Sequence, residues 1–149
     1  MGKFQAAFYK GTRPGLAGIY NRAVRWVDNG PHSHCELIFS DGIAASSSWA
    51  DGGVRFKQIY FDPARWDFID LPPEKEASAR QWFIEHEGEP YDLRGNLRFL
   101  VGVVRESGKG KFCSEATMAS LGFSEPWRYG PNGSAVILRD WARQWQIVL

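Results

Sequence analysis

Short apolar runs typical of β-strands dominate the first half of this chain. In most of the second half, apolar residues recur at the spacing of a helix. Residues 4–9 are largely apolar and predict a first strand. Apolar residues then recur every three to four positions from Leu16 to Val27, which predicts an amphipathic helix over residues 16–27. Asn29-Gly30-Pro31 follows and ends that helix.

Four more strands are predicted before residue 72. The first two flank Asp41-Gly42, a dipeptide typical of a hairpin turn. The other two are rich in aromatic and β-branched residues and are separated by Asp62-Pro63, which breaks a strand. The predicted strands cover residues 34–40, 43–48, 54–61 and 66–71.

The second half of the chain predicts helices. They cover residues 74–87, 91–104, 113–121 and 134–144. Consecutive antiparallel strands with separate helices indicate an α+β fold, a small antiparallel sheet or partial barrel packed against several helices. A length of 149 residues suits a single domain over residues 1–149.

Composition narrows the range of partners. The 18 basic and 17 acidic residues leave a formal charge of +1, so we expect no nucleic acid partner. We find no signal peptide and no apolar stretch long enough to span a bilayer, and we expect cytoplasmic synthesis. The two cysteines are too few for a secreted disulfide scaffold.

Cys113 is the candidate nucleophile. It follows the glycine-rich tract Gly108-Lys109-Gly110 and opens the predicted helix 113–121. The first N–H groups of a helix lack partners and carry partial positive charge, which stabilises a thiolate. The alternative is a buried structural cysteine, because free cysteines are among the most buried residues.

A cysteine nucleophile needs a base within hydrogen-bond reach, and the chain offers three histidines. His86 lies in a charged helix and reads as a solvated residue, while His32 follows Pro31 in a loop. His34 opens the predicted strand 34–40, a rigid element that suits a base, and it is our candidate.

The alternation of side chains along a strand separates the two cysteines. Cys35 points to the face opposite His34, so Cys113 is the expected partner of that imidazole. A disulfide between Cys35 and Cys113 stays open on sequence grounds, although a cytosolic location argues against it.

The imidazole also needs an orienting group, and two candidates follow from strand geometry. Ser46 lies on the next strand, where it is expected opposite His34. Glu36 shares the face of His34, about 7 Å along the strand, and is the stronger partner chemically.

Two other interpretations are compatible with these residues. His32, His34 and Glu36 are spaced so that a strand would place them on one face, which allows a metal site, although a fourth ligand is not evident. A binding module that has kept the fold and lost the chemistry is the other, and a serine at position 46 favours it because serine orients an imidazole weakly.

Three motifs resemble those of circularly permuted papain-like cysteine hydrolases of the YiiX/YebB type. These proteins are related to the NlpC-type cell-wall peptidases and to the lecithin–retinol acyltransferase group. The matching tracts are Ser33 to Gly42 around the histidine, Tyr91-Asp92-Leu93-Arg94-Gly95, and Phe112-Cys113-Ser114-Glu115. Their order, histidine before cysteine, is that of the permuted group.

The resemblance implies a third polar catalytic residue twelve positions after the strand histidine, which here is Ser46. The family more often has His, Glu, Asn or Gln at that position. Tyr91 and Asp92 would belong to the tract that precedes the nucleophile helix. Asp92 is expected to cap the predicted helix 91–104, or to line the site with Tyr91. Short proteins with such a histidine strand and a later Gly-Gly-Val-Arg tract, here Gly52 to Arg55, resemble chains encoded by phages and prophages.

The function implied is a cysteine hydrolase, a peptidase or amidase that forms an acyl-thioenzyme on an amide bond. The expected substrate is a cell-wall peptide, with peptidoglycan as the macromolecular partner and phage-mediated delivery to the wall. The alternatives are a lipid ester or thioester hydrolase or acyltransferase, and the binding module named above. No cofactor is required by this chemistry, and the oligomeric state is not predicted.

Overall fold

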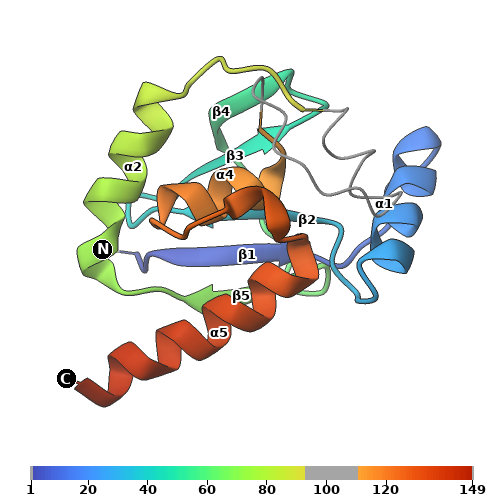
Figure 1. The fold of residues 1–149 in the computed structure, drawn as a ribbon. Helices are drawn as coiled ribbons and strands as arrows, with labels where there is room; N and C mark the ends of the chain where they lie inside the picture. The colour runs from blue at the N-terminus through green and yellow to red at the C-terminus, as the bar shows by residue number, and fades with distance from the viewer. Residues whose placement is uncertain (1, 93–110, 149) are drawn as a thin grey trace.

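Five antiparallel strands form one sheet in the computed structural model, which describes residues 2–92 and 111–148 (Figure 1). Their order across the sheet is β4-β3-β2-β1-β5. The central strand β1 therefore pairs with β2 on one side and β5 on the other. The strands are β1 (Gln5–Tyr9), β2 (His34–Ile38), β3 (Ile43–Ser48), β4 (Gly53–Gln58) and β5 (Trp66–Asp70).

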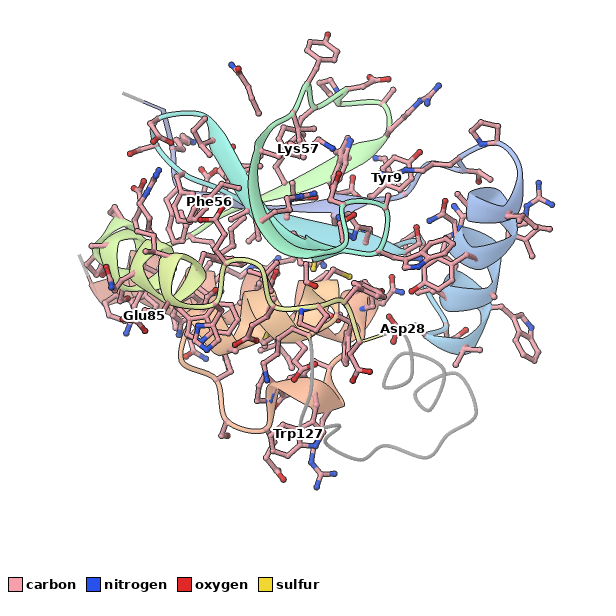
Figure 2. All side chains as sticks on the ribbon, turned by 90° about the horizontal axis from the view of Figure 1, so that it is seen from above. Tyr9, Asp28, Phe56, Lys57, Glu85 and Trp127 are labelled. Atoms are coloured by element: carbon pink, nitrogen blue, oxygen red, sulfur yellow. The ribbon has the colours of Figure 1, made fainter. Side chains whose placement is uncertain are left out.

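The helices lie on one face of the sheet and at one of its ends. Figure 2 shows α2 and α4 below the sheet, and α1 beyond its end. The C-terminal helix α5 contributes residues to the same core as α2 and α4. The helices are α1 (Leu16–Val27), α2 (Glu76–Glu85), α4 (Cys113–Ser120) and α5 (Pro131–Val148), with short 3-10 turns η1 (Pro73–Lys75) and η2 (Pro126–Arg128).

One large apolar cluster joins the sheet to these helices. Its aromatic centre is Phe39, which is 1% exposed and whose ring packs against three other phenylalanines. On the opposite face, Tyr9 and Trp66 pack against each other in a smaller cluster. Burying both faces fixes the strand register, because a slip of one residue would exchange the two sets of side chains.

Most of the predicted elements are confirmed, and the α+β class with them. The helix at 16–27 has the predicted bounds, and the nucleophile helix ends one residue earlier, at Ser120. The strand predicted at 54–61 is wrong in its last residues, since β4 ends at Gln58. The last helix was predicted too short, because Pro131 is well suited to the first turn of a helix.

The helix predicted at 91–104 falls almost wholly outside the described residues. Its first residue, Tyr91, instead forms an isolated parallel bridge with Lys111. None of the helices within residues 2–92 and 111–148 is long and apolar enough to cross a membrane.

The aromatic centre predicts where the fold is most sensitive. We expect Phe39→Ala to lower the free energy of unfolding by about 3–5 kcal/mol, because it removes a buried ring and leaves a cavity. The matched control is Tyr60→Ala, whose side chain is 90% exposed and which we expect to change stability by less than about 0.5 kcal/mol. Urea unfolding measures both, and equal effects would contradict this description of the core.

Candidate active site

Cys113 is the first residue of α4, and its neighbours hold it there. Phe112 caps the helix with an extended backbone, φ −96° and ψ 170°. The Glu115 carboxylate accepts a hydrogen bond from the Phe112 backbone N–H and pairs with Lys111 at 3.3 Å. The Ser47 hydroxyl donates a hydrogen bond to the Lys111 carbonyl, which links the backbone just before α4 to β3. Glu115 thus satisfies a backbone donor at the start of α4.

His34 is the first residue of β2 and faces Cys113. Its side chain is 15% exposed, and its ring meets the edge of Trp66 at a centroid distance of 6.3 Å. The imidazole is in hydrogen-bonding contact with the Cys113 side chain. Its Nε2 lies 2.7 Å from Glu36 Oε1, so the other ring nitrogen is left to face the sulfur. The structure thus brings together the nucleophile and base expected from the sequence.

Cys35 contributes to the same contact from the other face of β2. Its sulfur lies 3.4 Å from Thr117 Oγ1, one helical turn beyond Cys113 on α4. Both the thiol and the backbone N–H of Cys35 form hydrogen bonds with the Cys113 side chain. Both cysteines are free, so the disulfide left open by the sequence is not formed in this structure.

These contacts favour a thiolate on Cys113. The hydrogen bond from Cys35 is the largest cause, and the charge and hydrogen bond of His34 add to it. Together they outweigh burial and hold the pKa of Cys113 well below its usual value. Burial raises the pKa of Cys35 well above its usual value, so this residue remains a thiol that can donate.

The pKa of His34 shifts in the complementary direction. Burial alone would lower the pKa of His34, but the Cys113 thiolate and then Glu36 favour the protonated ring. The balance raises the pKa of His34 to about 9. Cys113 and His34 therefore form a thiolate–imidazolium pair between the lowered pKa of the sulfur and about pH 9.

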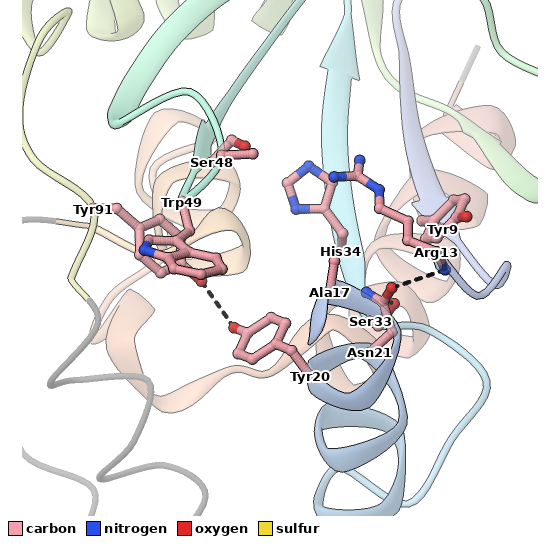
Figure 3. Close-up of a pocket in the computed structure, with 11 residues that line it drawn as sticks. Tyr9, Arg13, Ala17, Tyr20, Asn21, Ser33, His34, Ser48, Trp49 and Tyr91 are labelled. Carbon is pink, nitrogen blue, oxygen red and sulfur yellow. Dashed lines mark hydrogen bonds between the residues drawn. The ribbon is translucent and has the colours of Figure 1, made fainter. Parts of the chain in front are cut away.

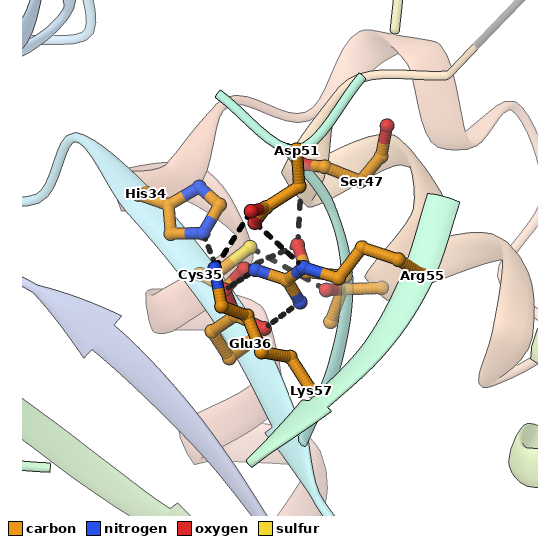
Figure 4. A network of polar contacts seen from close by, with 9 residues as sticks. His34, Cys35, Glu36, Ser47, Asp51, Arg55 and Lys57 are labelled. Carbon is orange, nitrogen blue, oxygen red and sulfur yellow. Dashed lines mark hydrogen bonds and ion pairs between the residues drawn. The ribbon is translucent and has the colours of Figure 1, made fainter. Parts of the chain in front are cut away.

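Glu36 belongs to a chain of charges that continues away from the site (Figure 4). Arg55 on β4 binds both of its carboxylate oxygens, each at 2.6 Å. The Arg55 Nε donates to Asp51 at 2.9 Å, and Asp51 also pairs with Lys57. Each charge in the chain thus has a partner of opposite sign, which buried charges require.

Arg55 keeps the buried carboxylate ionised. Glu36 is 1% exposed, and burial alone would raise its pKa. The hydrogen bonds from Arg55, and then those from His34, outweigh burial and lower the pKa of Glu36 below its usual value. An ionised Glu36 in turn favours the protonated form of His34.

Ser46 has a different position from the one expected. The pairing of Leu37 with Ala45, continued along the strands, places Ser46 beside Glu36 rather than opposite His34. Its hydroxyl donates to the Cys35 carbonyl at 2.7 Å. The hairpin closes with the Phe39 N–H donating to the Ile43 carbonyl, and this register puts Ser48 opposite His34, two residues beyond the expected Ser46. The structure places Glu36, and not Ser46, on the imidazole.

The remaining histidines have separate partners. His32 lies in the loop before β2, as expected, and its Nε2 is 2.8 Å from Asp67. His86 stacks on Trp82 at 3.9 Å and is partly buried rather than fully solvated. Across the described parts of the chain, no three His, Cys, Asp or Glu side chains are grouped to hold a metal.

A pocket of about 420 Å³ opens beside His34 (Figure 3). Its volume is in the range typical of small-ligand sites, roughly 300–1,000 Å³. Tyr91, expected near the site, lines it, and the Tyr91 and Tyr20 hydroxyls are 3.0 Å apart across it. Asp92 is buried beside this wall, and the helix it was expected to cap lies outside the described residues.

Sequence reasoning did not identify two parts of this site. Arg55 was noted only as the end of the tract Gly52 to Arg55, and its spacing on β4 held no signal of a partner on β2. The donor role of Cys35 was also missed. The alternation of side chains correctly put it opposite His34, but it could not show that the Cys113 sulfur reaches both faces at the strand end.

The donor role of Cys35 predicts a change in the reactivity of Cys113. We expect Cys35→Ala to raise the pKa of Cys113, because it removes the thiol donor. Cys35→Ser keeps a donor and should stay closer to the parent. The pH dependence of iodoacetamide alkylation at Cys113, followed by mass spectrometry, measures this. Identical midpoints in all three proteins would contradict the assigned hydrogen bond.

The contact between Glu36 and His34 predicts which residue tunes the base. We expect Glu36→Gln to lower the pKa of His34 from about 9, because the ring loses a negative partner. Ser46→Ala is the matched control and should leave that pKa unchanged. An NMR titration of the His34 ring measures both. An equal drop in Ser46→Ala, or no drop in Glu36→Gln, would contradict the assignment.

No protein-family model matches the chain, and no curated protein sequence matches it significantly. A functional assignment therefore depends on the contacts among Cys113, His34 and Glu36 themselves.

Proposed function

We propose that this protein is a cysteine hydrolase that cleaves an amide bond through an acyl-thioenzyme. The observation that carries the proposal is the buried contact between the Cys113 thiol and the His34 imidazole, which is completed by Glu36 at 2.7 Å. A nucleophile, a base and an orienting carboxylate in hydrogen-bonded sequence are the parts that nucleophilic acyl transfer requires.

The first half of the reaction forms the acyl-enzyme. The Cys113 thiolate attacks the carbonyl carbon, and a C–S bond forms as the C=O electrons move to oxygen. The backbone N–H of Cys113, at the first position of α4, donates to this oxyanion. The His34 imidazolium then gives its proton to the leaving nitrogen as the C–N bond breaks.

The second half releases the product. His34, now neutral, takes a proton from a water molecule while the water oxygen attacks the acyl carbon. The C–S bond breaks, the carboxylic product leaves, and the thiolate–imidazolium pair is restored. Glu36 holds the ring in one orientation through both halves, because it binds the nitrogen that does not face the sulfur.

The fold identity that we propose is the circularly permuted papain-like one. Supporting it are the histidine on β2, the cysteine at the start of α4 and the order of these two residues in the chain. The resemblance of the three motifs to cell-wall peptidases makes a peptidoglycan peptide the proposed substrate, reached from the cytoplasm by phage-mediated delivery.

Trapping the intermediate tests the proposal. We expect incubation with a panel of peptidoglycan fragments to give a mass adduct on Cys113 equal to the acyl portion of the substrate, and none in Cys113→Ala. Lipid esters in the same panel test the alternative substrate class. Hydrolysis that persists undiminished in Cys113→Ala, or a panel that leaves Cys113 unmodified, would contradict it.

A further inference from the structure

The pocket beside His34 contains one permanently charged side chain. Of the described residues that line it, only Arg13 carries a fixed charge, and four of the eleven are Tyr or Trp (Figure 3). The aromatic residues are Tyr9, Tyr20, Trp49 and Tyr91. Arg13 is thus the lining residue whose positive charge is not already paired within the catalytic contact.

The backbone of Arg13 is fixed relative to the catalytic strand. Its N–H donates to Asn21 Oδ1 at 3.3 Å, and the buried Asn21 donates in turn to Ser33 Oγ at 3.0 Å. Ser33 directly precedes His34. The Arg13 carbonyl also packs so closely on Gly18 that a Cβ there would lie 2.1 Å from its oxygen. Contacts to both the N–H and the carbonyl of Arg13 therefore hold the loop in place.

The Arg13 guanidinium lacks a carboxylate partner among the residues that the structure describes. It lies over the Tyr9 ring, 5.7 Å from the centroid. Arg55 and Arg80, in contrast, pair with Glu36 and Asp41. The planar fork of a guanidinium matches a carboxylate with two parallel hydrogen bonds, and stacking on a ring leaves that fork available.

From these contacts we infer that the pocket selects substrates that bear a carboxylate, which Arg13 binds while the aromatic walls pack against the adjoining apolar part. This inference rests on the proposed function, because it treats the pocket as the substrate site of Cys113. Arg13 acts as a specificity residue, and the covalent chemistry belongs to Cys113 and His34.

Two matched electrophiles test the inference without a known substrate. N-chloroacetyl-phenylalanine and its amide carry the same reactive carbon and the same aromatic ring, and differ only in the carboxylate. In each, the Cys113 thiolate displaces chloride, so that a C–S bond forms as the C–Cl bond breaks. The rate constants for labelling Cys113, measured by mass spectrometry at low salt, give an acid-to-amide ratio.

We expect the acid to react roughly tenfold faster than the amide, as one charge-assisted contact allows. The ratio should fall close to one in Arg13→Gln and keep an intermediate value in Arg13→Lys. Arg22→Gln is the matched control, because Arg22 is an exposed arginine on α1 outside the pocket, and it should keep the parent ratio.

A ratio close to one in the parent, or an unchanged ratio in Arg13→Gln, would overturn the inference. Failure of the proposed function gives a different result, a Cys113 that reacts with iodoacetamide only at the pH of an ordinary thiol. The two failures are distinguishable because the acid-to-amide ratio compares reagents, whereas the pH of alkylation reports on the thiol itself.

Discussion

The contact between the Cys113 sulfur and the His34 ring depends on charges that lie outside it. A buried imidazolium needs a negative partner on each side, and Cys113 and Glu36 supply these. Glu36, at 1% exposure, needs a cation of its own, and Arg55 supplies it with two hydrogen bonds. Removing Arg55 would leave a buried carboxylate short of a partner, which is among the most destabilising changes a protein interior can undergo.

The sheet brings these groups together although they come from distant parts of the chain. His34 and Glu36 share one face of β2, and Arg55 on β4 reaches across β3 to meet Glu36. Cys113 arrives on the opposite side with α4, where Cys35 and Thr117 lie between strand and helix. Side chains from both faces of the sheet therefore meet Cys113 at the end of β2.

Local sequence patterns predicted much of this arrangement, but they could not predict the contacts between distant parts of the chain. Helical spacing gave the helix at 16–27, and the alternation along β2 put Cys35 opposite His34, because both depend on neighbouring residues. The residue opposite His34 depends on the β2–β3 register, which the strand pattern alone left uncertain, so the expected position of Ser46 was wrong. Arg55 lies on a different strand, β4, and the spacing of residues along β4 does not indicate which strand will supply its partner.

The chemistry proposed for this site requires that Cys113 be a thiolate stabilised by His34. The pH dependence of Cys113 alkylation in the parent and in His34→Ala tests this most directly. We predict a parent midpoint well below the ordinary thiol pKa of 9.0, which moves upward when the imidazole is removed. A parent Cys113 that titrates at the ordinary value, or one that His34→Ala leaves unchanged, would contradict it.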